Sequence, residues 1–282
     1  MARDDLAAGR LARALEARFG GKFAVDAAQS GLADLAHLAE HRSHRTYAAR
    51  AVEPELLKLL FACALSAPSK SDLQQGDIVH LAAAAKRKVI AGLIPDMPWV
   101  KTAPVFLLFC GNNRRQRQLA EWRGKPFVND HLDAFMNAAV DSGIVLANFI
   151  RAASAAGLGC CPISAVRNHA AAISTLLELP DWVFPLAGLC VGYPAEAGKI
   201  TPRLPLEVTV HTDRFTETAT RAHIDAYDRR RAKLVPYAKQ RDNARFGKEK
   251  LYGWSEDKAR QYAAPERADW GAFIKGKGFR LE

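Results

Sequence analysis

Two arginines, two histidines and a hydroxyl group fall within five consecutive residues, just ahead of an expected helix: His41-Arg42-Ser43-His44-Arg45. The planar guanidinium group of arginine can hold two phosphate oxygens at once through charge-assisted hydrogen bonds. Ser43 can add a neutral hydrogen bond, and His41 can donate from whichever ring nitrogen carries a proton. The run therefore indicates a phosphate-binding site, although a basic stretch taken alone is also typical of a solvated helix flank.

Three further segments follow this run at intervals along the chain. They are Ala67-Pro68-Ser69-Lys70-Ser71-Asp72-Leu73-Gln74, Gly157-Leu158-Gly159-Cys160-Cys161-Pro162-Ile163-Ser164-Ala165 and Thr201-Pro202-Arg203-Leu204-Pro205. In this order the four segments resemble the nitroreductase superfamily. The chain is more narrowly similar to the NADPH-dependent nitroreductase and flavin reductase branch, because Leu189-Cys190-Val191-Gly192-Tyr193-Pro194 precedes Pro202 and a long C-terminal arm with Trp254-Ser255 follows. The resemblance covers about residues 37 to 282.

The resemblance implies an α+β fold, in which a central mixed, mainly antiparallel sheet is flanked by helices. It also implies a homodimer across which a C-terminal arm is exchanged. The corresponding domain boundaries are residues 1–36 for an N-terminal helical extension, 37–211 for the FMN-binding core and 212–282 for the dimer-embracing arm.

The implied activity is that of an FMN-dependent oxidoreductase. NADPH, or NADH, would deliver a hydride to the flavin N5 and leave, and a small-molecule acceptor would then collect electrons in the same place by a ping-pong mechanism. Nitro compounds, quinones and free flavins are all plausible acceptors. A non-catalytic or regulatory FMN-binding protein and a dehalogenating or ring-cleaving member of the superfamily stay open as alternatives.

The resemblance also assigns residues to the cofactor. His41, Arg42 and Arg203 would hold the FMN phosphate, with Ser43 and Ser69 on the ribityl chain or the phosphate. Arg45 would place a cation near the flavin N1 and C2 carbonyl, where negative charge develops on reduction. Pro162 and Ile163 would cover one ring face, and the backbone N–H groups of Ser164 and Ala165 would face O4 and N5. Gln74, Met97 and Thr201 complete the cofactor-contacting set, and no side chain is required as a nucleophile.

Other positions are assigned to the substrate side or depart from the branch pattern. Ser71 and Asp72 would lie at the pocket rim, and Arg241, Arg245 and Arg267 are candidates for the 2′-phosphate of NADPH or an acidic substrate group. Thr201 stands where a lysine is common, so one positive charge is missing. Met97 stands where a glutamine often reaches the flavin from the neighbouring subunit, and a thioether cannot donate a hydrogen bond.

The composition is compatible with a nucleotide-binding enzyme and disfavours some other classes of protein. The 282 residues are 49% hydrophobic, which is enough for a large core, and the formal net charge of +10 favours anionic partners such as nucleotide cofactors. Basic residues interleaved with aromatic ones are lacking, which disfavours nucleic acid. A hydrolase is disfavoured because Ser43, beside His41 and His44, lacks a nucleophile elbow.

The five cysteines are expected to be reduced core residues, among them Cys63, Cys110 and Cys190. Cys160 and Cys161 are adjacent in an expected extended segment, so their side chains should point to opposite faces, and no metal site is expected. The N-terminus lacks the order of a secretory signal, and the cytoplasm is the expected compartment.

Hydrophobic periodicity predicts helices over residues 6–19, 32–38, 54–68 and 132–156. Short apolar runs predict strands over 78–81, 104–110 and 186–191, of which the last two should be buried on both faces because they do not alternate. The helix over 132–156 is too polar to span a membrane, so no membrane partner is expected. Asn168 is expected to cap the helix that follows it, with Ile173, Leu176 and Leu177 facing inward.

Overall fold

The computed structural model describes residues 2–282, and the chain divides into two compact units. The helical unit contains the residues up to Arg42 together with Lys199–Glu266. The sheet unit contains Ser43–Gly198 together with Arg267–Glu282.

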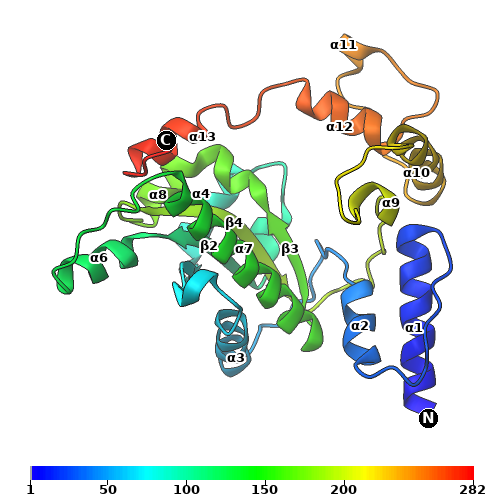
Figure 1. Ribbon diagram of the computed structural model, residues 1–282, viewed down its shortest axis with the longest axis horizontal. Coiled ribbons are helices and arrows are strands. Elements are labelled where there is room, and N and C mark those ends of the chain that lie inside the picture. The colour runs from blue at the N-terminus through cyan, green and yellow to red at the C-terminus, as the bar shows by residue number, and fades with distance from the viewer. Residues whose placement is uncertain (1) are drawn as a thin grey trace. The chain divides into compact units, whose positions relative to one another are not determined.

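Four antiparallel strands form the centre of the sheet unit, in the order β1-β2-β4-β3 (Figure 1). The strands are β1 (Gly76–His80), β2 (Val105–Asn112), β3 (Gly159–Ile163) and β4 (Val183–Gly192). All of β2 is buried, as its continuous apolar run predicts for a strand covered on both faces. An isolated bridge between Ser43 and Cys160 adds a parallel pairing beside β3.

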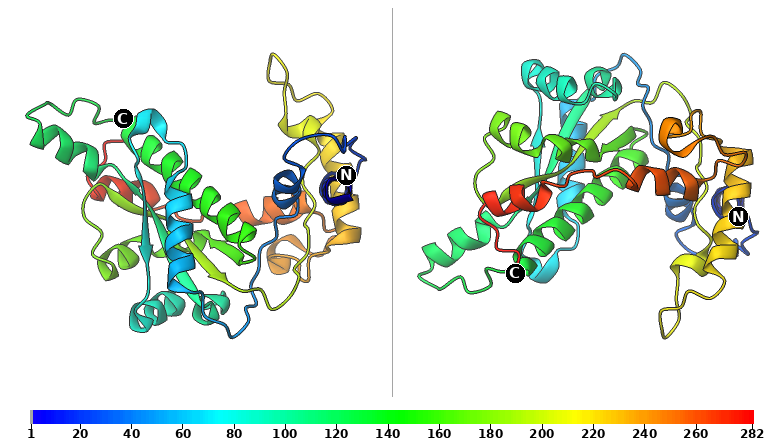
Figure 2. Two further views of the ribbon diagram at one scale, coloured as in Figure 1. Left: turned by 90° about the horizontal axis from the view of Figure 1, so that it is seen from below. Right: turned by 90° about the horizontal axis from the view of Figure 1, so that it is seen from above.

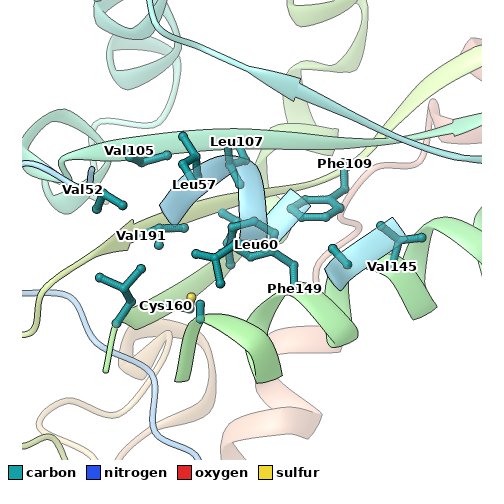
Figure 3. Packing of buried hydrophobic residues seen from close by; sticks show 14 residues of the cluster. Val52, Leu57, Leu60, Val105, Leu107, Phe109, Val145, Phe149, Cys160 and Val191 are labelled. Atoms are coloured by element: carbon teal, nitrogen blue, oxygen red, sulfur yellow. The ribbon is translucent and has the colours of Figure 1, made fainter. Parts of the chain in front are cut away.

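Successive side chains of β2 point alternately into two cores. Leu107 and Phe109 belong to a core shared with α3 (Pro54–Leu65) and α7 (Leu132–Ala155), in which Leu60 and Phe149 are buried (Figure 3). Phe106, Leu108 and Cys110 belong to the core on the other face, which is shared with α4 (Ala84–Leu93), α5 (Trp99–Thr102) and α8 (Ala170–Leu176). Helices therefore cover both faces of the sheet, as Figure 2 also shows.

The sheet unit is completed by η1 (Lys70–Asp72), α6 (Arg114–Trp122), η2 (Ser164–His169) and α13 (Trp270–Gly276). Helix α13 lies near the chain's C-terminus and returns to the sheet. Its Ile274 is buried in a small cluster with Ala138, Phe184 and Phe279. The last part of the expected arm thus packs on the chain's own sheet unit.

The helical unit contains α1 (Ala2–Phe19), α2 (Leu32–Ala39), α9 (Leu206–Thr209), α10 (Thr220–Leu234), α11 (Asn243–Phe246) and α12 (Trp254–Tyr262). Helices α1 and α2 pack closely because small residues line their contact, including Ala14, Ala36 and Ala39. Gly20 ends α1 in a left-handed conformation with φ of 80°. A side chain there would collide with Arg230, since a Cβ would lie 2.6 Å from its Nη1 atom.

The predicted helices over 6–19, 32–38, 54–68 and 132–156 are confirmed by α1, α2, α3 and α7, and the predicted strands by β1, β2 and β4. The extended segment at Cys160 and Cys161 is β3, and the two side chains do enter opposite cores. The predicted inward positions of Ile173, Leu176 and Leu177 are also confirmed. The α+β class and the mainly antiparallel sheet are therefore correct, whereas the boundaries at residues 36 and 211 stay predictions.

Two expectations are wrong. Cys63 is exposed on α3, because the buried positions of that helix are Leu57, Leu60 and Ala64 and Cys63 lies off this stripe. Asn168 does not cap α8, since it lies inside η2 and its side-chain oxygen accepts a hydrogen bond from Arg267 at 2.9 Å.

No helix among residues 2–282 is both long and apolar enough to cross a bilayer.

Candidate functional site

The loop that follows α3 is held by a buried carboxylate of α7. Asp141 is 1% exposed, and its two oxygens accept the backbone N–H groups of Lys70 at 3.0 Å and Gln75 at 3.1 Å. Three loop residues adopt left-handed backbone conformations, namely Ser71, Asp72 and Gln74, with φ of 49°, 57° and 52°. Such conformations cost about 1–2 kcal/mol each for residues with a Cβ. The anchors at both ends of the loop offset this cost.

The same loop borders a cavity of about 480 Å³. Four predicted site residues belong to this region of the sheet unit, and three of them line the cavity: Ser69, Asp72 and Gln74. The hydroxyl of Ser69 accepts the backbone N–H of Gln74 at 3.2 Å, and Asp72 accepts the Gln74 amide at 3.0 Å. Ser71, the fourth, is exposed on the loop. The structure therefore brings together the loop residues that the sequence pattern grouped.

The segment after Arg42 is fixed to β3. The backbone N–H of His44 donates to the carbonyl of Cys160 at 2.9 Å, and the hydroxyl of Tyr47 donates to the carbonyl of His44 at 2.7 Å. Gly159 permits this approach, because a Cβ there would lie 2.7 Å from Cγ of His44. Ser43 and Arg45 are exposed, and the guanidinium carbon of Arg45 lies 5.3 Å from the ring centre of Trp99. This cation–π contact holds Arg45 without neutralising its charge.

The end of β3 presents the next predicted group. Pro162 is exposed, whereas Ile163 is 1% exposed and its side chain lies in a hydrophobic core. Pro162 is thus the residue of the two with a ring available to cover a ligand, and Ile163 could contribute only through its backbone. Ser164 and Ala165 begin η2, and the first N–H groups of a helical turn have no partner within the turn. Met97 is half-buried against the same core, before α5.

Within the helical unit, Arg18 of α1 joins the segments that carry the predicted phosphate ligands. Its Nε donates to the carbonyl of Ala39 at 2.7 Å, its Nη1 donates to the carbonyl of Thr201 at 2.9 Å and its Nη2 donates to the carbonyl of His41. Arg42 and Arg203 follow these carbonyls in the chain. Burial lowers the pKa of Arg18, and the charges of Arg203 and Arg42 lower it further.

The Thr201–Arg203 segment also borders a cavity of about 600 Å³ inside the helical unit. Its lining combines cationic and aromatic side chains: Arg203, Arg231, Lys258, Tyr227, Tyr237 and Trp254. The guanidinium carbon of Arg231 lies 4.1 Å from the ring centre of Tyr237. Sequence reasoning assigned no role to Arg18, Asp141 or Lys258, because no local motif signals the contacts that these residues make.

The three arginines proposed for an anionic substrate group already have protein partners. Arg241 forms an ion pair with Asp257 at 3.1 Å, and Arg245 donates to the carbonyl of Ala263 at 3.0 Å. Arg267 belongs to the sheet unit and donates to Asn168. The structure therefore does not group Arg267 with the other two in one unit.

Thiol and metal chemistry receive no support from the described residues. Burial raises the pKa values of Cys110, Cys160, Cys161 and Cys190, which keeps these thiols protonated at neutral pH. Across residues 2–282 no group of three or more His, Cys, Asp or Glu side chains could hold a metal ion.

Comparison with known proteins identifies two matching family models. The model of the nitroreductase family matches residues 38–193, and that of the nitroreductase family, C-terminal domain, matches residues 201–282. An FMN reductase [NAD(P)H] of Bacillus subtilis is 35% identical over 248 residues, which are 87% of this chain and 97% of that protein.

Solved structures give the same result. Nitroreductase A of Vibrio parahaemolyticus superposes with a TM-score of 0.75 at 28% identity, over 87% of this chain and 97% of that one. The NADPH:FMN oxidoreductase of Vibrio harveyi complexed with NAD+ also has a TM-score of 0.75 at 28% identity, with the same coverage of both chains. The similarity thus extends over nearly the whole of each relative.

Proposed function

Since the chain belongs to the nitroreductase family, we propose that it is an NAD(P)H-dependent FMN oxidoreductase that passes a hydride to nitro compounds, quinones or flavins. The observation that carries this proposal lies in the helical unit, where the His41–Arg42 and Thr201–Arg203 segments meet on the guanidinium group of Arg18. Two relatives, at 35% and 31% identity, are named FMN reductase [NAD(P)H] and NADPH-flavin oxidoreductase, which supports the proposal.

The helical unit fits a phosphate. Arg18, Arg42 and Arg203 are close enough for the charges of the last two to depress the pKa of the first. Mutual repulsion of three cations is relieved by an anion bound among them, and arginine suits a phosphate in particular. His41, Arg42 and Arg203 are therefore the proposed ligands of the FMN phosphate. Ser43 and Ser69 belong to the sheet unit, and their proposed role on the ribityl chain or the phosphate rests on the resemblance alone.

The residues proposed to contact the flavin ring belong to the sheet unit. When bound, FMN supplies a position that accepts a hydride from the nicotinamide and donates it to the acceptor. Arg45 is held by the Trp99 ring and stabilises negative charge near N1 and the C2 carbonyl. The backbone N–H groups of Ser164 and Ala165 would donate to O4 and N5, Pro162 would cover one ring face, and Gln74 and Met97 would complete the contacts to the cofactor.

NAD(P)H and the acceptor bind in turn at one open face, which gives a ping-pong mechanism. Ser71 and Asp72 lie at the rim of the acceptor site. Arg241, Arg245 and Arg267 remain the proposed contacts for the 2′-phosphate or an acidic substrate group, although each must first leave or share its protein partner.

The active form is a homodimer. Leu132, Met136 and Val140 lie at four-residue steps on α7 and are exposed by 49%, 54% and 43%, which places an uncovered apolar stripe on one helix face. A second copy of the chain covers this stripe. Light scattering after size exclusion should give twice the chain mass for the wild type, and Met136→Glu should shift it toward the monomer.

The experiment that tests the function is steady-state oxidation of NADPH and NADH by the purified protein, with a nitroaromatic compound or a quinone as acceptor. Parallel double-reciprocal plots are expected for a ping-pong mechanism. A protein that retains FMN and oxidises neither nucleotide would instead be a non-catalytic FMN-binding protein. Product analysis separates nitro or quinone reduction from dehalogenation and ring cleavage.

A further inference from the structure

Arg18 is an unusual residue for the end of a helix, because its charged group is almost completely buried. Its exposed fraction is 6%, and three of the five N–H groups of its guanidinium donate to backbone carbonyls. Those carbonyls belong to residues far away in the sequence, since Thr201 lies 183 positions from Arg18. A buried cation is costly unless hydrogen bonds or an anion compensate it.

The charged groups near Arg18 include two other arginines and a carboxylate that is already bound in an ion pair. Burial is the largest of the causes that lower the pKa of Arg18, and the positive charges of Arg203 and Arg42 lower it further. The nearby Glu40 is held in a bidentate ion pair by Arg10, also on α1, and this hydrogen bonding lowers the pKa of Glu40. Arg10 therefore limits the capacity of Glu40 to neutralise Arg42.

The end of α1 is anchored on the opposite side as well. The carbonyl of Arg18 accepts the backbone N–H of Arg203 at 2.7 Å and Nη2 of Arg230 at 2.7 Å. Arg18 thus binds the Arg203 segment twice, through its own carbonyl and through its donation to Thr201. A shift of α1 would move Arg203 directly.

We propose that Arg18 is a positioning residue for the FMN phosphate, because its guanidinium group holds the carbonyls of His41 and Thr201. This inference rests on the proposed function. It assigns a role to the N-terminal helix, which lies outside the residues matched by the family models. Arg18 sets the spacing of the His41–Arg42 and Thr201–Arg203 backbones, and its charge adds to the field that attracts the phosphate.

The test compares FMN with riboflavin, which has the same ring and ribityl chain and no phosphate. Both ligands are titrated into the flavin-depleted full-length chain, and the ratio of their dissociation constants is measured. Arg18→Met retains the length of the side chain and removes the charge and the donors. Arg18→Lys retains the charge, and Arg13→Met is the matched control, because Arg13 is exposed on the same helix.

Arg18→Met should weaken FMN binding by about tenfold to a hundredfold, the usual range for losing one interaction with a charged group, while riboflavin binding changes little. Arg18→Lys should show a smaller loss and Arg13→Met none. Equal weakening of both ligands in Arg18→Met would overturn the proposal, because it would indicate a general loss of structure.

The remaining outcomes are equally decisive. If Arg18→Met does not fold, Arg18→Lys decides the question. The positioning role would be overturned if the ratio of the FMN and riboflavin dissociation constants were the same in Arg18→Lys as in the wild type. Increasing salt should reduce the FMN preference of the wild type more than that of Arg18→Met. A wild type that shows no preference for FMN over riboflavin would refute the proposed function itself, whatever Arg18 does.

Discussion

Asp141→Asn should loosen the loop from Ser69 to Gln75 without unfolding the rest of the sheet unit. The carboxylate of Asp141 is 1% exposed and accepts one backbone N–H at each end of this loop, from Lys70 and from Gln75. Asparagine has nearly the same shape, but it offers one oxygen and turns an NH₂ group toward the other N–H. One hydrogen bond is therefore lost and two donors face each other.

The magnitude follows from the type of bond that is lost. A hydrogen bond to a charged group contributes about 1.5–3 kcal/mol, and a buried donor without a partner adds a desolvation cost of similar size. The loop holds three residues in left-handed conformations, which favour release once an anchor weakens. We therefore expect the change to appear locally, as more frequent opening of the loop.

Hydrogen–deuterium exchange of peptides that cover residues 69–76 measures this opening. A loss of 1.5 kcal/mol corresponds to about tenfold faster exchange of the protected amides. Asp133→Asn is the matched control, because Asp133 is an exposed residue of the same helix and its carboxylate accepts a hydrogen bond from the side chain of Asn137. Unchanged exchange at Lys70 and Gln75 in Asp141→Asn would refute the assignment of Asp141 as the anchor of the loop.

Four further predictions concern single residues. Arg203→Ala should weaken FMN binding by about 1.5–3 kcal/mol in an equilibrium titration, because a charge-assisted phosphate contact is lost. Arg45→Ala should retain more FMN than Arg203→Ala and yet be reduced more slowly by NADPH in stopped-flow traces; equal flavin loss in both would contradict the separate roles. Cys161→Ser should leave turnover nearly unchanged, because burial raises the pKa of this thiol. The ion pair with Arg10 holds the pKa of Glu40 in the folded chain below its usual 4.5, so the pair stabilises the folded chain above about pH 4.5. This contribution is lost as the pH falls through the lower, folded-state pKa. Glu40→Gln should therefore flatten the acid side of a curve of the free energy of unfolding against pH.

Local patterns predicted the elements of this fold well. The 3- and 4-residue spacing of apolar residues identifies α7, and the continuous apolar run of β2 predicts its burial on both faces. The same approach failed for Cys63, because apolar residues surround α3 and the sequence alone does not show which stripe faces the core. The predicted helix cap at Asn168 was wrong for a related reason, because its hydrogen-bond partner Arg267 is 99 positions away.

The candidate site was predictable where its residues are contiguous and unpredictable where they are held from a distance. The basic run at His41 and the loop at Ser69 contain their own donors in sequence, so their chemistry can be recognised from residue types. Asp141 and Arg18 carry no such local signal, because a single Asp or Arg on an amphipathic helix is ordinary. Their roles depend on tertiary contacts that bring them to backbone groups 66 and 183 positions away.

Position 201 offers a way to test the charge of Arg18 separately from its positioning contacts. A lysine at this position would bring its charge on a flexible stem, at the entropic cost of ordering it on a phosphate. Arg18 is instead held by three carbonyls before any ligand arrives, so its charge is already in place. The cost of burying that charge is offset in the folded chain by these three hydrogen bonds. It follows that a lysine placed at position 201 should make the chain depend less on Arg18, and Thr201→Lys should restore part of the FMN preference lost in Arg18→Met.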